Sequence, residues 1–279
     1  MDEAARYGRF FESHGRAVIV TVSAVKGSTP REEGAAIAVS ATATCGTVGG
    51  GQLEFMAIDH ARALLSGTTD TMRLDIPLGP DIGQCCGGRT ELSFEIADAS
   101  AIAAFLARLD AEAERAPSVF IFGGGHVGSA LSAALAPLPF NTVLIETRSD
   151  MVEALADGVS LRLTPMPEAE IASLPSGSAV VILTHDHALD FLIATEALKR
   201  ADLSYCGMIG SKTKRATFLN YARRQGLTER GCARLTMPIG GTSVADKRPA
   251  IIAALVAAEL ISVIHAAKAG RLHTADAAR

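Results

Sequence analysis

The sequence has no excess of positive charge and no apolar segment long enough to cross a membrane. Its formal net charge is −4 and its pI is about 6.0. This argues against nucleic acid as the main partner, because neutralising a phosphate backbone needs clustered cations. The longest apolar run, 251–264, falls short of the roughly 20 residues of a bilayer-spanning helix and is interrupted by Glu259. We therefore expect a protein that binds neither nucleic acid nor a membrane.

The sequence also lacks a secretory signal and a disulfide framework. It begins MDEAARYGRFF, which is acidic and has no basic start followed by an apolar core. Its cysteines number five, an odd count, and are spread along the chain, unlike those of small disulfide-bonded secreted proteins. We therefore expect a cytoplasmic protein.

The pattern of apolar residues and turn residues predicts two domains. In the first half, β-branched segments predict strands at 17–25, 35–40 and 91–96, and apolar spacing predicts a helix at 53–65. A polar, alanine-rich stretch then ends at Pro117. We place an N-terminal mixed α+β domain at 1–112 and a C-terminal domain at 113–279.

The second half alternates strands and helices with the regularity of an α/β fold. Five strands are expected, at 118–122, 141–146, 159–163, 179–183 and 204–210. Helices are expected between them, one of them at 150–158, and a long helix from about 248 to 267 follows. This pattern predicts a Rossmann-type doubly wound parallel sheet with strand order 3-2-1-4-5.

A glycine turn follows the first of these strands. Gly123, Gly125 and Gly128 form G-x-G-x-x-G directly between a strand and a helix. In that context the glycines allow a tight turn, close approach of a pyrophosphate and packing of helix on strand. Glu146 ends the next strand, near the spacing of an acid that binds ribose hydroxyls. The turn predicts a phosphate-bearing ligand, and the alternative is a turn kept for packing alone.

Two further loops fall at the same edge of the predicted sheet. His185 and His187 follow the fourth strand, and two histidines without a third ligand favour a hydrogen-bonding role over a metal site. Ser211 and Lys212 open the helix after the fifth strand. Cations there oppose the helix dipole, so an anion would offset the cost, although a solvated basic face explains the charges equally well.

The first half carries a glycine run and a pair of adjacent cysteines. Gly49, Gly50 and Gly51 precede a helix, and such a run either presents N–H groups to an anion or makes a tight turn. Cys85 and Cys86 lie between glycines in LGPDIGQCCGG. Glycine neighbours leave a thiol accessible, which favours sulfur or soft-metal chemistry over inert, buried cysteine.

These motifs occur in order along the chain. They read GSTPREEGA, GTVGGGQLE, GPDIGQCCGG, FIFGGGHVG, ILTHDHALD, YCGMIGSKTKR and MPIG. With them the sequence resembles the XdhC/CoxI family, the xanthine dehydrogenase accessory factors, from about residue 17 to residue 264. The chain departs from the family pattern after Gly240, where it continues GTSVADKRPAIIA and lacks an acid after Pro249. That departure leaves the contribution of the last loop open.

The resemblance implies a role in maturing molybdenum hydroxylases. Such factors bind the molybdenum cofactor (molybdopterin), protect it while a cysteine desulfurase supplies its terminal sulfur, and deliver it to an apo-enzyme such as xanthine dehydrogenase. The implied pterin or sulfur contacts are Gly49, Gly50, Gly51, Gln84, Cys85 and Cys86, the two cysteines lying near the molybdenum. The implied contacts at the phosphate or dinucleotide end are Gly123, Gly125, His126 and Gly128.

We therefore expect a cofactor chaperone without turnover of its own, and a homodimer would suit such a carrier. The main alternative is a nucleotide-dependent oxidoreductase that binds NAD(P), with Glu146 on the ribose and His185 or His187 as acid or base. A sulfurtransferase with a persulfide on Cys85 or Cys86 is a third reading.

Overall fold

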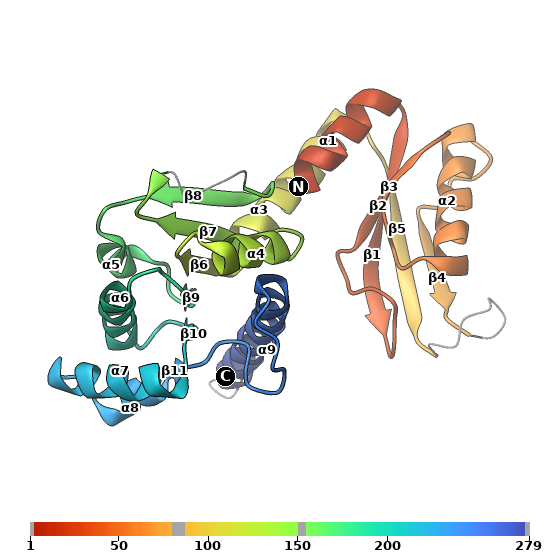
Figure 1. Cartoon of the computed structure of the whole chain (residues 1–279). Coiled ribbons are helices and arrows are strands. Elements are labelled where there is room, and N and C mark those ends of the chain that lie inside the picture. The colour runs from red at the N-terminus through yellow and green to blue at the C-terminus, as the bar shows by residue number, and fades with distance from the viewer. Residues whose placement is uncertain (1–2, 80–86, 150–154, 277–279) are drawn as a thin grey trace. The chain divides into compact units, whose positions relative to one another are not determined.

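The protein consists of two compact units, residues 1–112 and 113–279, each with its own sheet (Figure 1). The computed structural model describes residues 3–79, 87–149 and 155–276, and side chains as far as residue 266. In the first unit the helices are α1 (Glu3–His14), α2 (Gly51–Ser66) and α3 (Ala99–Glu114). Its strands are β1 (Ala17–Lys26), β2 (Ala36–Ser40), β3 (Thr44–Gly46), β4 (Arg73–Pro77) and β5 (Arg89–Ile96).

The first unit is an antiparallel sheet in the order β3-β2-β1-β5-β4. Successive side chains of a strand point to opposite faces, and β1 is buried on both. Val18, Val20 and Val22 pack in a cluster with α2. Ala17 and Ile19 pack in a second cluster with α1 and α3.

The sequence predicted the long strands and α2 of this unit to within a few residues, but it missed β3 and β4. β3 has only three residues. β4, with the sequence RLDIP, buries only Ile76, so neither shows the apolar alternation of a half-buried strand. The polar stretch before Pro117 forms the second half of α3, which buries Ala101, Phe105 and Leu109.

The second unit is a six-stranded parallel sheet in the order β11-β10-β9-β6-β7-β8. Its strands are β6 (Ser118–Phe122), β7 (Asn141–Glu146), β8 (Val159–Leu163), β9 (Ala179–Ile182), β10 (Tyr205–Met208) and β11 (Leu235–Thr236). This confirms the predicted Rossmann-type fold and strand order. The sequence did not predict the sixth strand, β11, because two residues are too few to show a strand pattern.

Helices cover both faces of this sheet. They are α4 (His126–Leu135), α5 (Pro167–Glu170), α6 (His187–Lys199), α7 (Lys212–Arg224), α8 (Glu229–Ala233) and α9 (Pro249–Asp276), with a 3-10 turn η3 (Ile171–Ser173) after α5. The expected helix at 150–158 falls partly on residues 150–154, outside the described residues, and residues 157–158 form a turn.

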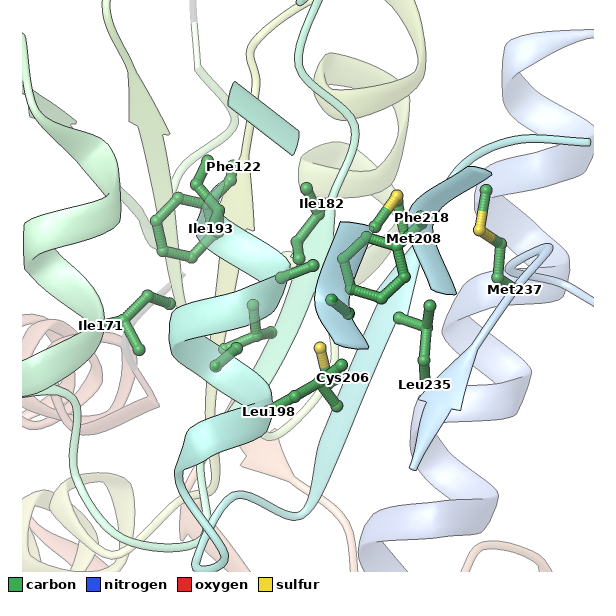
Figure 2. Packing of buried hydrophobic residues seen from close by; sticks show 14 of the residues in the cluster. Phe122, Ile171, Ile182, Ile193, Leu198, Cys206, Met208, Phe218, Leu235 and Met237 are labelled. Atoms are coloured by element: carbon green, nitrogen blue, oxygen red, sulfur yellow. The ribbon is translucent and has the colours of Figure 1, made fainter. Parts of the chain in front are cut away.

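The strands of the second unit are buried on both sides, as parallel strands between two helix layers must be. Figure 2 shows Phe122 and Met208 of the strands packed against Ile193 of α6 and Phe218 of α7. On the opposite face, Ile121 belongs to a second cluster with residues of α4 and α9. Successive strand residues thus alternate between the two cores.

Among the described residues, one helix, α9, is long and apolar enough to cross a membrane by length and composition, over Pro249–Ala266. This corrects the expectation from the sequence that no apolar segment is long enough. The α9 residues Ala253, Val256, Leu260 and Ile264 are buried in the core cluster that contains α4. Packing inside the second unit therefore accounts for the apolar stripe of this helix.

Replacing Leu144 tests the core of the second unit. Leu144 of β7 is 0% exposed, so we expect Leu144→Ala to lower the free energy of unfolding by about 2–5 kcal/mol through lost burial and a residual cavity. Leu192→Ala is the control, because Leu192 of α6 is 42% exposed and surface changes typically cost about 0.5 kcal/mol or less. Urea unfolding followed by circular dichroism measures both, since the chain has no tryptophan. Equal losses in the two variants would contradict this account of the core.

Candidate functional site

Three of the predicted loops meet at the carboxyl edge of the parallel sheet. Gly123 follows β6, His185 follows β9 and Ser211 follows β10, and these three strands are neighbours. The loops stay in register beyond the strands, because Leu183 N donates to Phe122 O and Ile209 N donates to Ile182 O, both at 2.9 Å. This is the edge at which open α/β sheets bind ligands.

Two glycines of the turn are required by close packing. Gly123 has a φ of 117°, and a Cβ there would crowd the backbone of Leu183 and Thr184. A Cβ on Gly128 would overlap the carbonyl oxygen of Gly123, so any larger residue would push α4 away from β6. The first and third glycines thus have structural reasons that need no ligand.

Gly125 has no such structural reason. It is the N-cap of α4 with φ −65° and ψ −174°, a conformation that other residues adopt readily. A Cβ on Gly125 would meet nothing within 4 Å. Its missing side chain leaves the N-terminus of α4, where backbone N–H groups favour an anion, open to approach. His126, the next residue, is exposed.

Glu146 at the end of β7 is bonded to the glycine turn. Its Oε2 accepts from Gly124 N at 2.7 Å, and its Oε1 accepts from Thr147 N at 2.7 Å and from Arg148 N at 3.2 Å. Burial alone would raise the pKa of Glu146, but the bonds from Gly124, Arg148 and Thr147 outweigh it and lower the pKa to about 2. The carboxylate is therefore charged near neutral pH and holds the middle of the turn in place.

A buried ion pair joins the loops after β9 and β10. Asp190 of α6 accepts from Thr184 through N at 2.9 Å and Oγ1 at 2.7 Å. Its other oxygen accepts from Lys214 Nζ at 2.5 Å, and Lys214 also donates to Ile209 O at 3.1 Å. The two side chains are 0% and 10% exposed. This network fixes the spacing of the two loops.

The remaining polar residues of this edge have local roles or face solvent. Ser211 caps α7 by accepting from Lys214 N at 3.2 Å. Asp186 caps α6 by accepting from Ala188 N at 2.7 Å. His185, His187 and Lys212 are exposed. Within the described residues no three His, Cys, Asp or Glu side chains are grouped to hold a metal.

The last loop of the second unit is also held by a carboxylate that accepts from a glycine N–H group. Gly240 N donates to Glu259 Oε2 of α9 at 2.7 Å, so the glutamate that interrupts the apolar run of α9 holds this loop. Asp246, further along the loop, accepts from Arg248 N at 2.9 Å and forms an ion pair with the Arg248 side chain. In this chain Asp246 thus binds Arg248, the residue that precedes α9.

In the first unit, the glycine run before α2 is bonded to acceptors of its own chain. Glu54 Oε2 accepts from Val48 N and Gly50 N, each at 3.2 Å. Gly49 N donates to Thr47 Oγ1 at 3.1 Å. The carboxylate of Glu54 thus accepts from N–H groups that we expected, from the sequence, to bind an anionic ligand.

The three glycine-containing motifs of the first unit lie close together. A Cβ on Gly49 would lie 2.6 Å from Pro30 Cγ, and a Cβ on Gly27 would lie 3.3 Å from the Cα of Gly88. Leu78 and residues 87–88 are joined by two backbone hydrogen bonds of 2.9 Å. Gln84, Cys85 and Cys86 lie outside the described residues.

Sequence reasoning placed Lys214 only among the cations at the start of α7 and did not identify the groups that hold the loops. They are Glu54, Asp190, Lys214 and Glu259. Asp190 and Lys214 were within the recognised motifs ILTHDHALD and YCGMIGSKTKR. For Glu54 the available signal was an acid three residues after a glycine run, and only the folded backbone distinguishes such an acid from a solvated one.

The second unit is thus a Rossmann-type domain with an open glycine turn, preceded by a smaller domain whose glycine motifs converge. Residues 119–260 match the XdhC Rossmann domain, and residues 11–75 match the XdhC and CoxI family. The chain belongs to the XdhC and CoxI family.

Two known proteins are similar over most of the chain. The protein YqeB of Escherichia coli (strain K12), described as uncharacterised, is 25% identical over 256 residues. The match covers 88% of this chain but 43% of YqeB, so the chain spans less than half of that relative. A crystal structure described as a xanthine dehydrogenase from Bacillus halodurans shares the fold, with a TM-score of 0.76, 18% identity and coverage of 95% and 96% of the two chains.

Breaking the buried pair tests the loop network. We expect Lys214→Met to lower the free energy of unfolding by about 3–5 kcal/mol, because it leaves the Asp190 carboxylate buried and unpaired. Lys199→Met is the matched control: Lys199 pairs with Glu196 on the surface, where the side chains are 52% and 44% exposed, and such pairs contribute about 0–1 kcal/mol. Urea unfolding measures both, and similar losses would show that the buried pair is not structural.

Proposed function

We propose that this protein binds the molybdenum cofactor, supports its terminal sulfuration and delivers it to an apo molybdenum hydroxylase such as xanthine dehydrogenase. Membership of the XdhC and CoxI family implies an accessory role toward xanthine dehydrogenase. The observation that carries the finer proposal is Gly125, a glycine that neither backbone conformation nor packing requires. A cytoplasmic location, a cysteine desulfurase as partner and a homodimeric state belong to the same proposal.

The described residues fit the phosphate of a molybdopterin. Gly125 and the first N–H groups of α4 would hold it, since this helix start is free of side-chain capping. His126 and Lys212, both exposed, would donate to its oxygens from the first positions of α4 and α7. Bound there, the cofactor would supply a molybdenum centre with an exchangeable sulfur ligand.

Cys85 and Cys86 are the groups we propose for the sulfur step. Thiolates are good partners for a soft metal and for sulfane sulfur. Within the parts of the chain that the structure describes, the other cysteines are Cys45, Cys206 and Cys232, and the last two are buried. Burial raises the pKa of the Cys206 thiol to about 12, which leaves it protonated and unsuited to sulfur transfer.

The geometry favours a carrier over the rival oxidoreductase. An acid–base histidine is usually oriented by a second polar group. Here the nearby carboxylates are used elsewhere: Asp186 caps α6, and Asp190 binds Thr184 and Lys214. Among the described residues, no carboxylate is bonded to His185 or His187. This supports a protein that holds its ligand without turnover, and NAD(P) chemistry becomes the weaker alternative.

Gly125→Val tests the phosphate position. A valine side chain would fill the open space at the start of α4, so we expect the affinity for the cofactor to fall at least tenfold, or about 1.4 kcal/mol. The melting temperature should change little, because φ −65° suits valine. The measurement is mass spectrometry of the cofactor bound to protein purified from a molybdopterin-producing host. Ala133→Val, at an exposed position of the same helix, is the control, and normal binding by Gly125→Val would move the phosphate elsewhere.

Single serine substitutions test the sulfur step. Cys85→Ser and Cys86→Ser remove a soft ligand while scarcely changing volume, because a serine hydroxyl stays protonated near neutral pH. We expect reduced cofactor retention or reduced activation of an apo molybdenum hydroxylase in a reconstitution assay. Lost retention indicates a ligand contact, and retained cofactor with lost activation indicates sulfur handling. Cys45→Ser in the same unit is the control, and full activation by both test variants would refute the assignment.

A further inference from the structure

The strands at the edges of the two sheets differ in how well they are protected. An edge strand offers unpaired N–H and C=O groups to any further strand. In the part of the chain that the structure describes, the edges are β3 and β4 in the first unit and β11 and β8 in the second. β3 has three residues and β11 has two, which leaves little to pair with. The exposed residues of β4 are Arg73, Asp75 and Pro77, and charge and proline are usual protections of an edge strand.

β8 is the exception among these edges. Figure 1 shows it at the outer edge of the sheet of the second unit. It pairs with β7 over all five of its residues without a bulge, and its sequence, VSLRL, contains no proline or glycine. Leu161 and Leu163 are 40% and 50% exposed. Single exposed leucines are common, but two on a regular, unpaired edge strand favour association with another strand.

The backbone groups on the open side of β8 follow from one hydrogen bond to β7. Thr164 N donates to β7 at 3.0 Å. Because backbone groups alternate in direction along a strand, those of Leu163, Leu161 and Val159 face away from β7. Val159 N already donates to Ala156 O at 3.2 Å. The open side therefore offers the N–H and C=O groups of Leu161 and Leu163 and the C=O group of Val159.

The two faces of β8 differ in polarity. Leu161 is paired with Leu144 of β7, which is 0% exposed and belongs to the core cluster with α4 and α9. Residues paired in this way share a face of the sheet, so the apolar surface of this core continues outward along β8. Ser160 and Arg162 lie on the opposite face, where Arg162 forms an ion pair with Glu170 of α5.

β8 is complementary to a second copy of itself. In an antiparallel pair with a two-fold axis at Leu161, this residue faces its own copy, Val159 faces Leu163, and Ser160 faces Arg162. Apolar side chains then meet apolar ones on one face, and no arginine faces an arginine on the other. The open backbone groups fit the same register, because each Leu161 N would donate to Leu161 O of the other copy and each Leu163 N to Val159 O.

We propose that β8 of one chain pairs antiparallel with β8 of a second copy and joins the two six-stranded sheets into one. The inference rests on the homodimeric state in the proposed function and deepens it by naming the contact surface. Five strand residues a side are fewer than the roughly 20–30 of a standard interface. We therefore expect a dimer that dissociates on dilution.

Opposite charges at residue 161 test the pairing, because this residue faces its own copy. Leu161→Lys places two ammonium groups opposite each other and Leu161→Glu places two carboxylates there, and like charges in that position destabilise a strand pair. Sedimentation velocity of the full chain at low ionic strength, over a dilution series, measures the dissociation constant. We expect a dimer for the wild type, a dissociation constant at least tenfold larger for each variant, and recovery of the dimer when the two variants are mixed.

Leu192→Lys and Leu192→Glu are the matched controls, because Leu192 of α6 is 42% exposed, close to the 40% of Leu161. They should dimerise as the wild type does, alone and mixed. Circular dichroism checks that each variant is folded. If the variants at residue 161 fail to fold, Leu163→Lys replaces them and should also weaken the dimer.

The outcomes separate a second copy from other occupants of this edge. A dimer that Leu161→Lys leaves intact overturns the inference, and so do two variants that stay monomeric when mixed. A wild-type chain that is monomeric at every concentration also overturns it. If, in that case, Leu161→Lys abolishes activation of an apo molybdenum hydroxylase, the edge binds that enzyme instead of a second copy.

The inference and the proposed function also fail in different ways. A wild-type chain that carries molybdopterin from a producing host but stays monomeric overturns the inference and leaves the carrier function standing. A dimer that responds to the charges at residue 161 as expected but carries no cofactor refutes the carrier function and leaves the inference.

Discussion

Buried or half-buried carboxylates that accept hydrogen bonds from backbone N–H groups hold the functional loops of this protein. The bonded pairs are Glu54 with Gly50, Glu146 with Gly124, Asp190 with Thr184, and Glu259 with Gly240. Glycine makes a loop able to turn sharply but gives it no side chain with which to pack, so it loses more entropy on ordering than other residues. A charge-assisted bond from a rigid helix or strand offsets that loss.

These bonds also decide where a ligand can bind. An N–H group that already has a carboxylate partner is less available to an outside anion, and the carboxylate repels one. In the first unit Glu54 occupies part of the glycine cradle before α2. In the second unit Glu146 occupies Gly124 but leaves Gly125 and the start of α4 open. The start of α4 in the second unit is therefore less occupied by the chain's own carboxylates than the glycine run of the first unit.

The ion pair of Lys214 with Asp190 extends this arrangement across the sheet. Removing either partner would leave a charge in a site from which water is excluded, which is costly. The loops after β9 and β10 are thus held against each other by a fixed contact, and both lie on one side of the glycine turn after β6. Loops that are ordered in advance in this way lose little entropy when a ligand binds.

Much of this could be predicted from the sequence, because its signals are local. Alternating strand and helix patterns determine a parallel sheet, right-handed crossovers determine its order, and G-x-G-x-x-G between strand and helix locates the turn. The short strands β3, β4 and β11 gave too weak a pattern. Glu146 shows most clearly what the sequence did not predict. Its spacing predicted a ribose ligand, but its carboxylate also accepts hydrogen bonds from Gly124 N and Arg148 N and so holds the glycine turn.

The sequence by itself determined the fold class, the family resemblance and which loops carry the candidate chemistry, since each depends on residues that are close in the chain. Only the tertiary structure decided which of three glycines is free to meet a ligand. Gly123 is crowded by backbone from the loop after β9 and Gly128 by backbone of the turn itself, whereas a side chain on Gly125 would face open space. It also decided which acids are bonded internally, because Asp190 and Lys214 are 24 residues apart and meet only when β9 and β10 pair.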